Sequence, residues 1–545
     1  MEIFPPLNQP ADLVGYNLFE SDPVLAESIA ENASWAVTQL SRFGETLGQA
    51  DWLEQGRLAN RHEPILQAFS RQGQRIDEVE FHPAWHRLIG LGVEQGVHCL
   101  PWVEERVGAH QARVAAHYLL TQIEAGVGCP LTMTFAAVPS LRRQPELASQ
   151  WVPRITSRQY DFGLRPPQDK KGCLMGMAMT EKQGGSDVRA NTTRAEALGD
   201  GTYRLQGHKW FCSAPMCDAF LTLAQMSAGV TCFLVPRILP DGQRNRVHIQ
   251  RLKDKVGNRS NASSEIEYHG AIAWRVGEEG RGVPTIIEMV NHTRLDCVVG
   301  TSSLMRAALV QALHHCRTRS AFGRKLVEQP LMQNVLADLT LEWEAALQLM
   351  LRLAQGFDGS VKDPGEAAFV RLATAVSKYW VCKRGARFAQ EAMECLGGSG
   401  YVEESVMPRL YREMPLASIW EGSGNVICLD VLRAVHKTPE TLELFFAEVE
   451  STRGGDRRLD QAVDNLKASW RRPEEAEVRA RRLVERMALV LQGSLLLRRS
   501  PSFVAEAFCG TRLGDNCLME FGTLPSGTAH QALLERGWQN ALALR

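Results

Sequence analysis

The sequence predicts a mainly α-helical protein with a β-rich domain in the middle of the chain. Long segments rich in Ala, Leu, Glu and Arg fill the first third and the last half of the 545 residues. Short apolar runs separated by Asp-Gly turns fill the part between them. A chain of this length needs several hydrophobic cores. We expect four domains: residues 1–171 helical, 172–280 β-rich, 281–437 helical and 438–545 helical.

Particular segments carry this division. Helical periodicity with few breakers is typical of residues 102–124, 331–353 and 366–396, and the last two predict a helical bundle. The apolar runs 220–224 and 232–235 are short enough for strands. Since no repeat recurs at a fixed period, a solenoid or propeller is not expected.

Composition and charge exclude several classes of protein. The net charge of -1 gives no overall attraction to nucleic acid or to an anionic membrane, so such a partner needs a local patch. The 13 cysteines include no Cys-x-x-Cys pair and no metal-ligand spacing, which favours a reducing compartment and no bound metal. The first ten residues lack the features of a signal peptide, and the apolar stretch 487–497 is too short to span a bilayer. We expect a cytoplasmic protein.

A change in residue type marks the first candidate binding segment. Apolar residues from Met177 stop at Thr180, and two glycines, Gly184 and Gly185, precede Ser186. Glycine lets backbone amides approach a ligand closely, and short hydroxyls can hydrogen-bond a flat heteroaromatic ring or a phosphate. Taken alone, a Gly-Gly-Ser-Asp run is more often a plain surface turn.

Later runs give this segment a context. Residues 207–213 place an aromatic pair beside a hydroxyl on an expected strand, which suits a planar ring as well as an ordinary core strand. Three further runs follow in order: Arg319–Gly323, Leu396–Tyr401 and Arg412–Asn425. In order and spacing the five runs resemble the acyl-CoA dehydrogenase superfamily, over roughly residues 90 to 435.

This resemblance implies the superfamily fold, which is helical, β and helical in turn, with FAD as cofactor. It implies that Arg319 and Phe322, in the family's Arg-x-x-Phe-Gly, reach FAD across a subunit interface of a homotetramer. A Rossmann dinucleotide site is not expected, because no Gly-x-Gly-x-x-Gly run is present. The remaining cofactor contacts that the resemblance implies are Met177, Thr180, Gly185, Ser186, Phe211, Ser213, Trp420, Gly422, Ser423 and Asn425.

Glu421 occupies the position of the family's catalytic base. That base removes the α-proton of an acyl thioester while a hydride leaves the β-carbon for the flavin. Partial desolvation raises the pKa of a carboxylate towards the operating pH and makes it a better base. Outside this motif, Glu421 would be an ordinary acid at a helix start. Arg294 resembles a recurrent arginine of the family that lines the same cavity, and an ion pair with Asp296 or Glu288 is an equal alternative.

The chain also departs from ordinary acyl-CoA dehydrogenases. Its glycine loop has Lys-Gln-Gly where the family commonly has Pro-x-Ala, Trp420 precedes the base, and over one hundred residues follow the flavin motifs. These features, with residues 252–263, resemble a bacterial alkylation-response branch of the superfamily. In that branch a helical extension is associated with double-stranded DNA. The resemblance therefore implies a DNA partner and a role under alkylation stress, and it leaves acyl-CoA turnover open.

Charge within the extension is uneven. Residues 451–499 hold twelve Arg or Lys against seven Asp or Glu, an excess of five, whereas residues 500–545 hold three arginines and four acids. A helix starting at Pro473 would align several arginines on one face, although a solvated face containing Glu477 and Glu485 is the commoner meaning. The residues expected to contact DNA are Arg479, Arg482 and Arg486, which recur at i, i+3 and i+7 on this face, and Arg433, Lys437 and Arg512, which are added from charge alone.

Two other functions stay open at this point. One is a catabolic acyl-CoA dehydrogenase that uses Glu421 for α,β-dehydrogenation. The other is a flavin-dependent monooxygenase or nitroalkane oxidase on the same scaffold. Nitroalkane oxidases carry Asp at the position of the base, so the glutamate argues mildly against that branch.

Overall fold

The computed structural model describes residues 7–514 and 518–538. Contacts divide the chain into two compact units, each assembled from separate stretches. The first consists of Met1–Trp52, His110–Gln122 and Cys297–Arg545, and the second of Leu53–Ala109 and Ile123–Asp296. The predicted fold class, mainly α with a central β-domain and a C-terminal helical part, is confirmed.

The second unit is built on a seven-stranded sheet. Its order is β3-β6-β4-β5-β9-β7, with β8 paired to β9, and a further pairing of β6 with β7 closes the path on itself. The predicted strands at 220–224 and 232–235 lie in β6 and β7, whose centres are buried. The strands are β3 (Met175–Ala178), β4 (Arg194–Ala197), β5 (Thr202–Ser213), β6 (Ala219–Met226), β7 (Gly229–Pro236), β8 (Val247–Leu252) and β9 (Ser263–Val276).

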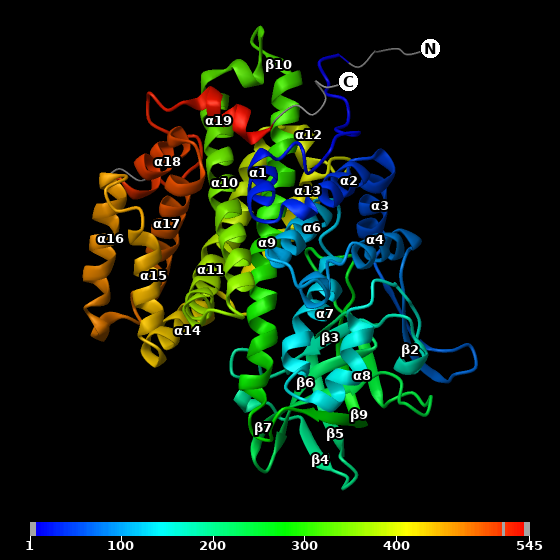
Figure 1. Ribbon diagram of the computed structural model, residues 1–545. Helices are drawn as coiled ribbons and strands as arrows, with labels where there is room; N and C mark the ends of the chain where they lie inside the picture. Colours follow the sequence, from blue (N-terminus) through cyan, green and yellow to red (C-terminus); the bar gives the residue numbers. More distant parts are fainter. Residues whose placement is uncertain (1–6, 515–517, 539–545) are drawn as a thin grey trace, which may run out of the picture. The chain divides into compact units, whose positions relative to one another are not determined.

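Helices of the second unit cover this sheet. The α7 helix is buried along nearly its whole length and packs against β3, and α8 packs against α7 (Figure 1). Because α7 carries buried residues on all of its faces, it is a core helix. The helices are α4 (Pro83–Glu94), α5 (Leu100–Val103), α7 (Gly128–Leu141) and α8 (Pro145–Ile155), with most of α3 (Ala50–Arg61) and the first part of α9 (Gly282–Thr318).

A β-hairpin interrupts the region where the sequence predicted mainly helix. Strands β1 (Ile65–Phe69) and β2 (Arg75–Glu80) pair antiparallel. Asp77 anchors the hairpin to β8, because its carboxylate accepts a hydrogen bond from the backbone N–H of Ile249 at 2.9 Å and pairs with Arg75 at 2.8 Å. Asp77 and Ile249 lie 172 positions apart in the sequence, so the local pattern carries no trace of their contact.

The first unit is a helical bundle. The predicted segments 331–353 and 366–396 form α10 (Pro330–Gly359) and α11 (Pro364–Glu394), and each helix begins with proline, whose fixed φ suits the first turn. The segment predicted as one helix at 102–124 is broken between α5 and α6. The other helices up to residue 437 are α1 (Pro23–Asn32), α2 (Val37–Leu47), α6 (Ala109–Ile123), α12 (Gly398–Tyr401), α13 (Met407–Glu413) and α14 (Gly424–Lys437).

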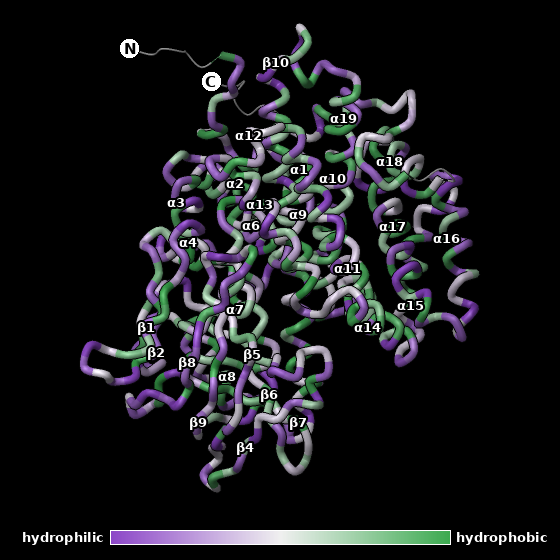
Figure 2. Tube along the Cα trace, turned by 180° about the vertical axis from the view of Figure 1, so that it is seen from behind, coloured by the Kyte–Doolittle hydropathy of each residue, from purple (hydrophilic) through white to green (hydrophobic). Residues whose placement is uncertain are grey.

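The extension after residue 437 belongs to the same unit and is helical (Figure 1). Along α16, hydrophilic and hydrophobic stretches alternate, as expected of a helix with one buried face (Figure 2). Among the residues that the structure describes, no helix is long and apolar enough to cross a bilayer. The helices of the extension are α15 (Glu440–Glu450), α16 (Arg457–Trp470), α17 (Ala480–Arg499), α18 (Ser502–Phe508) and α19 (His530–Gly537).

Arginines attach the extension to α10. The guanidinium group of Arg512 pairs with Asp338 and lies 3.2 Å from Glu342, and Arg536 lies 3.2 Å from Glu344. All three carboxylates are buried. Buried charges of this kind need a partner, so these arginines stabilise the contact between the extension and the bundle.

Candidate active site

The Thr180 loop follows β3 in the second unit. Met177 is buried within β3, so only its backbone can serve a ligand, whereas Thr180 is half-buried and Ser186 is exposed. The loop turns tightly, with Glu181 and Gly184 bridged and φ of Gly184 at 134°. A Cβ on Gly185 would lie 2.3 Å from the Thr180 hydroxyl oxygen. Glycine is therefore required for the loop to fold against Thr180.

The end of β5 lies directly beside this loop. The backbone N–H of Trp210 donates to the carbonyl oxygen of Thr180 at 2.8 Å. Phe211 is 47% exposed, Ser213 is half-buried and Cys212 between them points into the core, which follows the alternation of a strand. The Lys253 ammonium nitrogen lies 3.5 Å from the Trp210 ring centroid and 4.7 Å from that of Phe211. The structure thus brings together the two predicted flavin segments of this unit.

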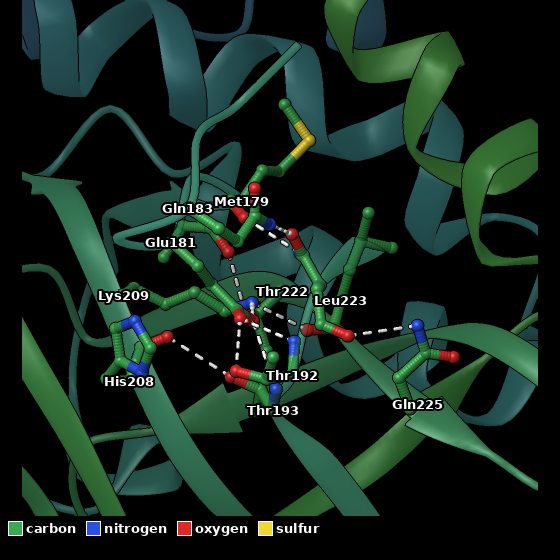
Figure 3. Close-up of polar contacts among 12 residues, drawn as sticks. Met179, Glu181, Gln183, Thr192, Thr193, His208, Lys209, Thr222, Leu223 and Gln225 are labelled. Atoms are coloured by element: carbon green, nitrogen blue, oxygen red, sulfur yellow. Dashed lines mark hydrogen bonds and ion pairs between the residues drawn. The ribbon is translucent and has the colours of Figure 1, made fainter. Parts of the chain in front are cut away.

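A buried ion pair between Lys209 and Glu181 joins the two segments, and Figure 3 shows its polar contacts. The Lys209 ammonium donates to a Glu181 carboxylate oxygen at 2.9 Å and to the Leu223 carbonyl oxygen at 2.8 Å, and both charged side chains are 0% exposed. Glu181 also accepts backbone hydrogen bonds from Thr192 at 2.6 Å and from Thr193 at 3.2 Å. Every oxygen of this carboxylate is therefore engaged.

The surroundings of this pair shift the pKa values of both partners. Burial by itself would raise the pKa of Glu181, but the Lys209 ammonium and the hydrogen bonds from the threonines outweigh it and lower the pKa to about 2. Burial lowers the pKa of Lys209, and Glu181 opposes that shift. Both residues lie within the runs predicted to bind flavin, yet nothing in the sequence singles them out. Only the pairing of β5 with the Thr180 loop brings them into contact.

Glu421 lies in the first unit, in the short connection between the turn Leu416–Ser418 (η5) and α14. It is half-buried and has a φ of 56°, in the left-handed region that costs a non-glycine residue about 1–3 kcal/mol. Gly422 follows with a φ of 106°. Lys378, a buried residue of α11 that the sequence did not single out, donates from its ammonium group to the carbonyl oxygens of Trp420, at 2.9 Å, and of Gly422. The strained turn is thus held from the bundle side.

The start of α14 follows this turn. Ser423 is its N-cap residue but makes no capping bond with its side chain, and Asn425 is exposed. The Arg481 guanidinium, from α17 of the extension, donates to the Asn425 side-chain oxygen at 2.8 Å. A Cβ on Gly424 would lie 2.8 Å from the Lys383 side chain and 3.4 Å from that of Arg481. Two cations therefore flank a helix N-terminus, an arrangement that suits a phosphate group.

The Arg-x-x-Phe-Gly run forms a short hairpin, β10 (Ser320–Ala321) and β11 (Arg324–Lys325). Phe322 lies at its tip, 99% exposed and with a φ of 51°. The Arg319 guanidinium donates to the carbonyl oxygen of Asn8 at 2.8 Å. The part of the chain that the structure describes therefore leaves the Phe322 side chain exposed.

Arg294 is a buried residue of α9 in the second unit. Of the two acids considered as its partners, Glu288 pairs with Arg143 at 2.7 Å and Asp296 accepts a hydrogen bond from Thr132 at 2.6 Å. The place of Arg294 in the catalytic cavity stays a prediction.

The residues predicted to contact DNA fall into two groups. Arg433 and Lys437 on α14 and Arg482 on α17 are exposed, and Arg486 is half-buried. Arg512 is not available, because it is occupied by the buried acids of α10. Arg479 is engaged too, since it donates to the carbonyl oxygen of Arg472 at 2.7 Å and pairs with Glu475 at 3.2 Å.

The predicted start of a helix at Pro473 is wrong. Pro473–Glu475 forms only a short turn (η6), and α17 begins at Ala480. Val478 is 94% exposed, so the intervening residues bury no apolar face that would stabilise a helix. Arg479 therefore precedes the helix, and of the three arginines predicted to share one face, two, Arg482 and Arg486, lie on α17.

Each unit, taken by itself, presents groups that suit part of FAD. The second unit presents the hydroxyls of Thr180, Ser186 and Ser213 beside the exposed ring of Phe211, a set that suits a planar heteroaromatic ring. The first unit presents two cations at the N-terminus of α14, which suits a diphosphate.

Three family descriptions match the chain. The adaptive response protein AidB N-terminal domain matches residues 8–162, the acyl-CoA dehydrogenase middle domain matches residues 176–271, and the acyl-CoA dehydrogenase C-terminal domain matches residues 280–436.

Individual relatives extend the match into the remaining residues. The chain is 48% identical over 509 residues to the putative acyl-CoA dehydrogenase AidB of Escherichia coli, covering 93% of this chain and 94% of that protein. It is 32% identical over 480 residues to acyl-CoA dehydrogenase family member 11 of Caenorhabditis elegans, covering 83% of this chain and 76% of that protein.

Solved structures agree with this assignment. The Caenorhabditis elegans protein ACDH-11 in complex with C11-CoA superposes with a TM-score of 0.85 at 28% identity, over 92% of both chains. An acyl-CoA dehydrogenase of Bacillus anthracis complexed with FAD has a TM-score of 0.64 at 17% identity, over 78% of this chain and 80% of that chain, which shows the shared fold alone. The chain therefore belongs to the AidB-like part of the acyl-CoA dehydrogenase superfamily, whose members use FAD.

Proposed function

We propose that this protein is a flavoprotein that binds double-stranded DNA and acts in protection or repair under alkylation stress, and that it retains acyl-CoA dehydrogenase chemistry at Glu421. The flavin chemistry and the DNA binding rest on different residues. They can therefore be tested separately.

One observation supports the dehydrogenase chemistry above all others. Glu421 is held in a left-handed turn by the bridge from Lys378, although that conformation is costly for glutamate. Strain of this kind persists where the surrounding structure fixes a side chain for use. In this proposal the Glu421 carboxylate removes the α-proton of an acyl thioester. FAD, when bound, supplies the acceptor for the hydride from the β-carbon.

Anaerobic mixing with a panel of acyl-CoA thioesters tests this role. We expect at least one thioester to bleach the oxidised flavin, and we expect Glu421→Gln to abolish bleaching because an amide cannot accept the α-proton. Glu404→Gln is the matched control, since Glu404 is an exposed glutamate of the same unit. Wild-type protein that bleaches with none of the panel, or an active Glu421→Gln variant, would refute the proposed chemistry.

DNA binding is proposed for the surface formed by Arg433, Lys437 and Arg482. The Arg433 side chain is 63% exposed, and Lys437 follows it by one turn on α14. The hydrogen bond between Arg481 and Asn425 holds the start of α17, which carries Arg482, against the start of α14, whereas Arg433 and Lys437 lie in the last turns of α14. Arginine and lysine at the two ends of one helix can contact separate phosphates along a duplex without reading sequence.

Titration with random duplex DNA at two salt concentrations tests this surface. Replacing Arg433, Lys437 and Arg482 with glutamate should weaken binding and reduce the salt dependence, by about 0.9 in the log–log slope for each phosphate that is no longer neutralised. Arg457→Glu is the single-site control, because Arg457 is exposed on α16 outside the proposed surface. Equal affinity and equal slope for the triple variant and wild type would exclude this surface.

The role under alkylation stress is the broadest part of the proposal. It is supported by the match to the adaptive response protein AidB N-terminal domain and by the similarity to AidB of Escherichia coli. A deletion strain should be more sensitive to a methylating agent, and wild-type protein should restore survival. Complementation with Glu421→Gln and with the triple surface variant would show which activity matters. Equal survival of the deletion strain and its parent would argue against the role.

A homotetramer is proposed from the exposed hairpin that carries Arg319 and Phe322. The Phe322 side chain is 99% exposed in one chain, and a neighbouring subunit would cover it in the proposed assembly. Light scattering during size exclusion should give about four times the chain mass of 60.6 kDa. A monomer with full flavin content would contradict the placement of Arg319 at a neighbouring subunit's cofactor.

A further inference from the structure

We infer that Lys378 is a positioning residue, whose ammonium group fixes the peptide carbonyls on both sides of Glu421 and so holds that carboxylate in place. This inference rests on the proposed role of Glu421 as base. It adds a residue on α11 that neither the sequence motifs nor the chemistry of the thioester points to.

The geometry is that of a bridge. Lys378 is 1% exposed, and its Nζ lies 2.9 Å from the carbonyl oxygen of Trp420 and also donates to that of Gly422. An ammonium group has three donors arranged around one atom, so a single lysine can engage both carbonyls at once. The two carbonyls bracket Glu421 along the chain.

The bracketed backbone needs support. Glu421 and Gly422 are consecutive residues with φ values of 56° and 106°. Glycine adopts such values readily, but glutamate does not, so the turn would relax towards ordinary φ values if it were free. The Lys378 bridge opposes that relaxation because moving either carbonyl would leave a buried ammonium donor unsatisfied.

The support comes from a rigid element. Lys378 lies in the middle of α11, a helix of 31 residues, whereas Glu421 lies in a short connection between η5 and α14. Sites on connections are less precise than sites on helices unless a neighbouring element fixes them. An apolar side chain at position 378 would be buried at lower cost than an ammonium group. The charge is therefore explained by the carbonyls that it holds.

Two variants and one control test this inference. Lys378→Met keeps the length and burial of the side chain but removes all three donors. Lys378→Gln retains a donor group on a shorter side chain that cannot reach both carbonyls, and it serves if the methionine variant fails to fold. Lys362→Met is the control, because Lys362 is an exposed lysine just before α11.

The first measurement is hydrogen exchange of the peptide that spans residues 415–426, in the protein as purified with its flavin. We expect exchange in this peptide to be at least about tenfold faster in the Lys378 variants, since the turn loses its bridge. Peptides of the second unit and the control variant should be unchanged. Unchanged exchange at 415–426 in a folded Lys378 variant would overturn the inference.

The second measurement reports on the base itself. A 3-thia-acyl-CoA has an acidic α-proton but a sulfur atom in place of the β-carbon, so it can be deprotonated without turnover. Its enolate beside the oxidised flavin gives a long-wavelength absorbance. We expect Lys378→Met to bind this analogue with unchanged affinity but to lose at least about tenfold of that absorbance. A purely structural lysine would lower flavin content and leave the absorbance per flavin unaltered, which would overturn the positioning role.

The two measurements separate the inference from the proposed function. If wild-type protein and Glu421→Gln behave alike towards the analogue, the proposed base is wrong, and the positioning role falls with it even where exchange is faster. If wild type forms the enolate and Glu421→Gln does not, the proposed base stands. The Lys378 variants then decide the inference alone.

Discussion

Replacing Lys209 with methionine should strongly destabilise the second unit. The change removes the ammonium group that pairs with Glu181 (Figure 3) and leaves a carboxylate that is 0% exposed without its counter-charge. Breaking a buried pair by removing one partner costs about 3–5 kcal/mol. At about 2–4 °C per kcal/mol for a domain of this size, the unfolding transition of this unit should fall by roughly 6–20 °C.

The same pair predicts a dependence on pH. The pKa of Glu181 is about 2 in the folded protein, below the value of about 4.3 in an unfolded chain. A depressed pKa stabilises the fold at pH values above the unfolded value, and this contribution is lost as the pH falls from about 4.3 to about 2. The difference corresponds to about 3 kcal/mol. In Lys209→Met the loss between these pH values should be much smaller.

Thermal unfolding followed by flavin fluorescence and by circular dichroism is the assay. Lys171→Met is the matched control, because Lys171 is exposed in the same unit. The double variant Lys209→Met with Glu181→Met removes both charges. Its loss of unfolding free energy should be smaller than the sum of the losses in the two single variants. A fall of less than about 2 °C for Lys209→Met, or strict additivity in the double variant, would refute the reasoning.

Three further outcomes are expected. Burial raises the pKa of Asp358 to about 6, so wild type should lose about 3 kcal/mol as the pH rises from about 4 to above 6, and Asp358→Asn should abolish that dependence in urea titrations. Gly185→Ala should weaken FAD binding about tenfold, because its Cβ would lie 2.3 Å from the Thr180 hydroxyl, whereas Gly300→Ala, which meets nothing within 4 Å, should not. Arg512→Met should reduce the free energy of unfolding by about 3–5 kcal/mol, and so lower the unfolding temperature, because it leaves the buried acids of α10 without their counter-charge. DNA affinity should stay unchanged. A loss of DNA affinity without destabilisation would contradict the structural role of Arg512.

Strong local patterns were enough to predict the main elements. The segments 331–353 and 366–396 correspond to α10 and α11, and the apolar runs 220–224 and 232–235 lie within β6 and β7. In each case the periodicity of apolar residues or the shortness of the run distinguishes helix from strand. The predicted flavin motifs were located differently, because the order and spacing of five short runs resemble those of the acyl-CoA dehydrogenase superfamily.

Elements without such a pattern were missed or misplaced. The hairpin of β1 and β2 depends on the contact of Asp77 with Ile249, and the start of α17 depends on which apolar faces are buried. The charge of a residue was the least informative feature of the sequence, because it did not predict which arginines are exposed. Arg482 and Arg512 are alike in sequence, yet one is exposed and the other is occupied by the acids of α10.

The sequence by itself predicted the fold class from local apolar patterns, and the superfamily and the position of the proposed base from the resemblance of short ordered motifs to that superfamily. Only the tertiary structure decided which charged residues support that base and which hold the fold together. Lys378 and Trp420, whose carbonyl oxygen it contacts, are 42 positions apart, and Lys209 and Glu181 are 28 positions apart. Their contacts depend on how helices and strands pack, and a charge acquires its role only from the partners that packing brings to it.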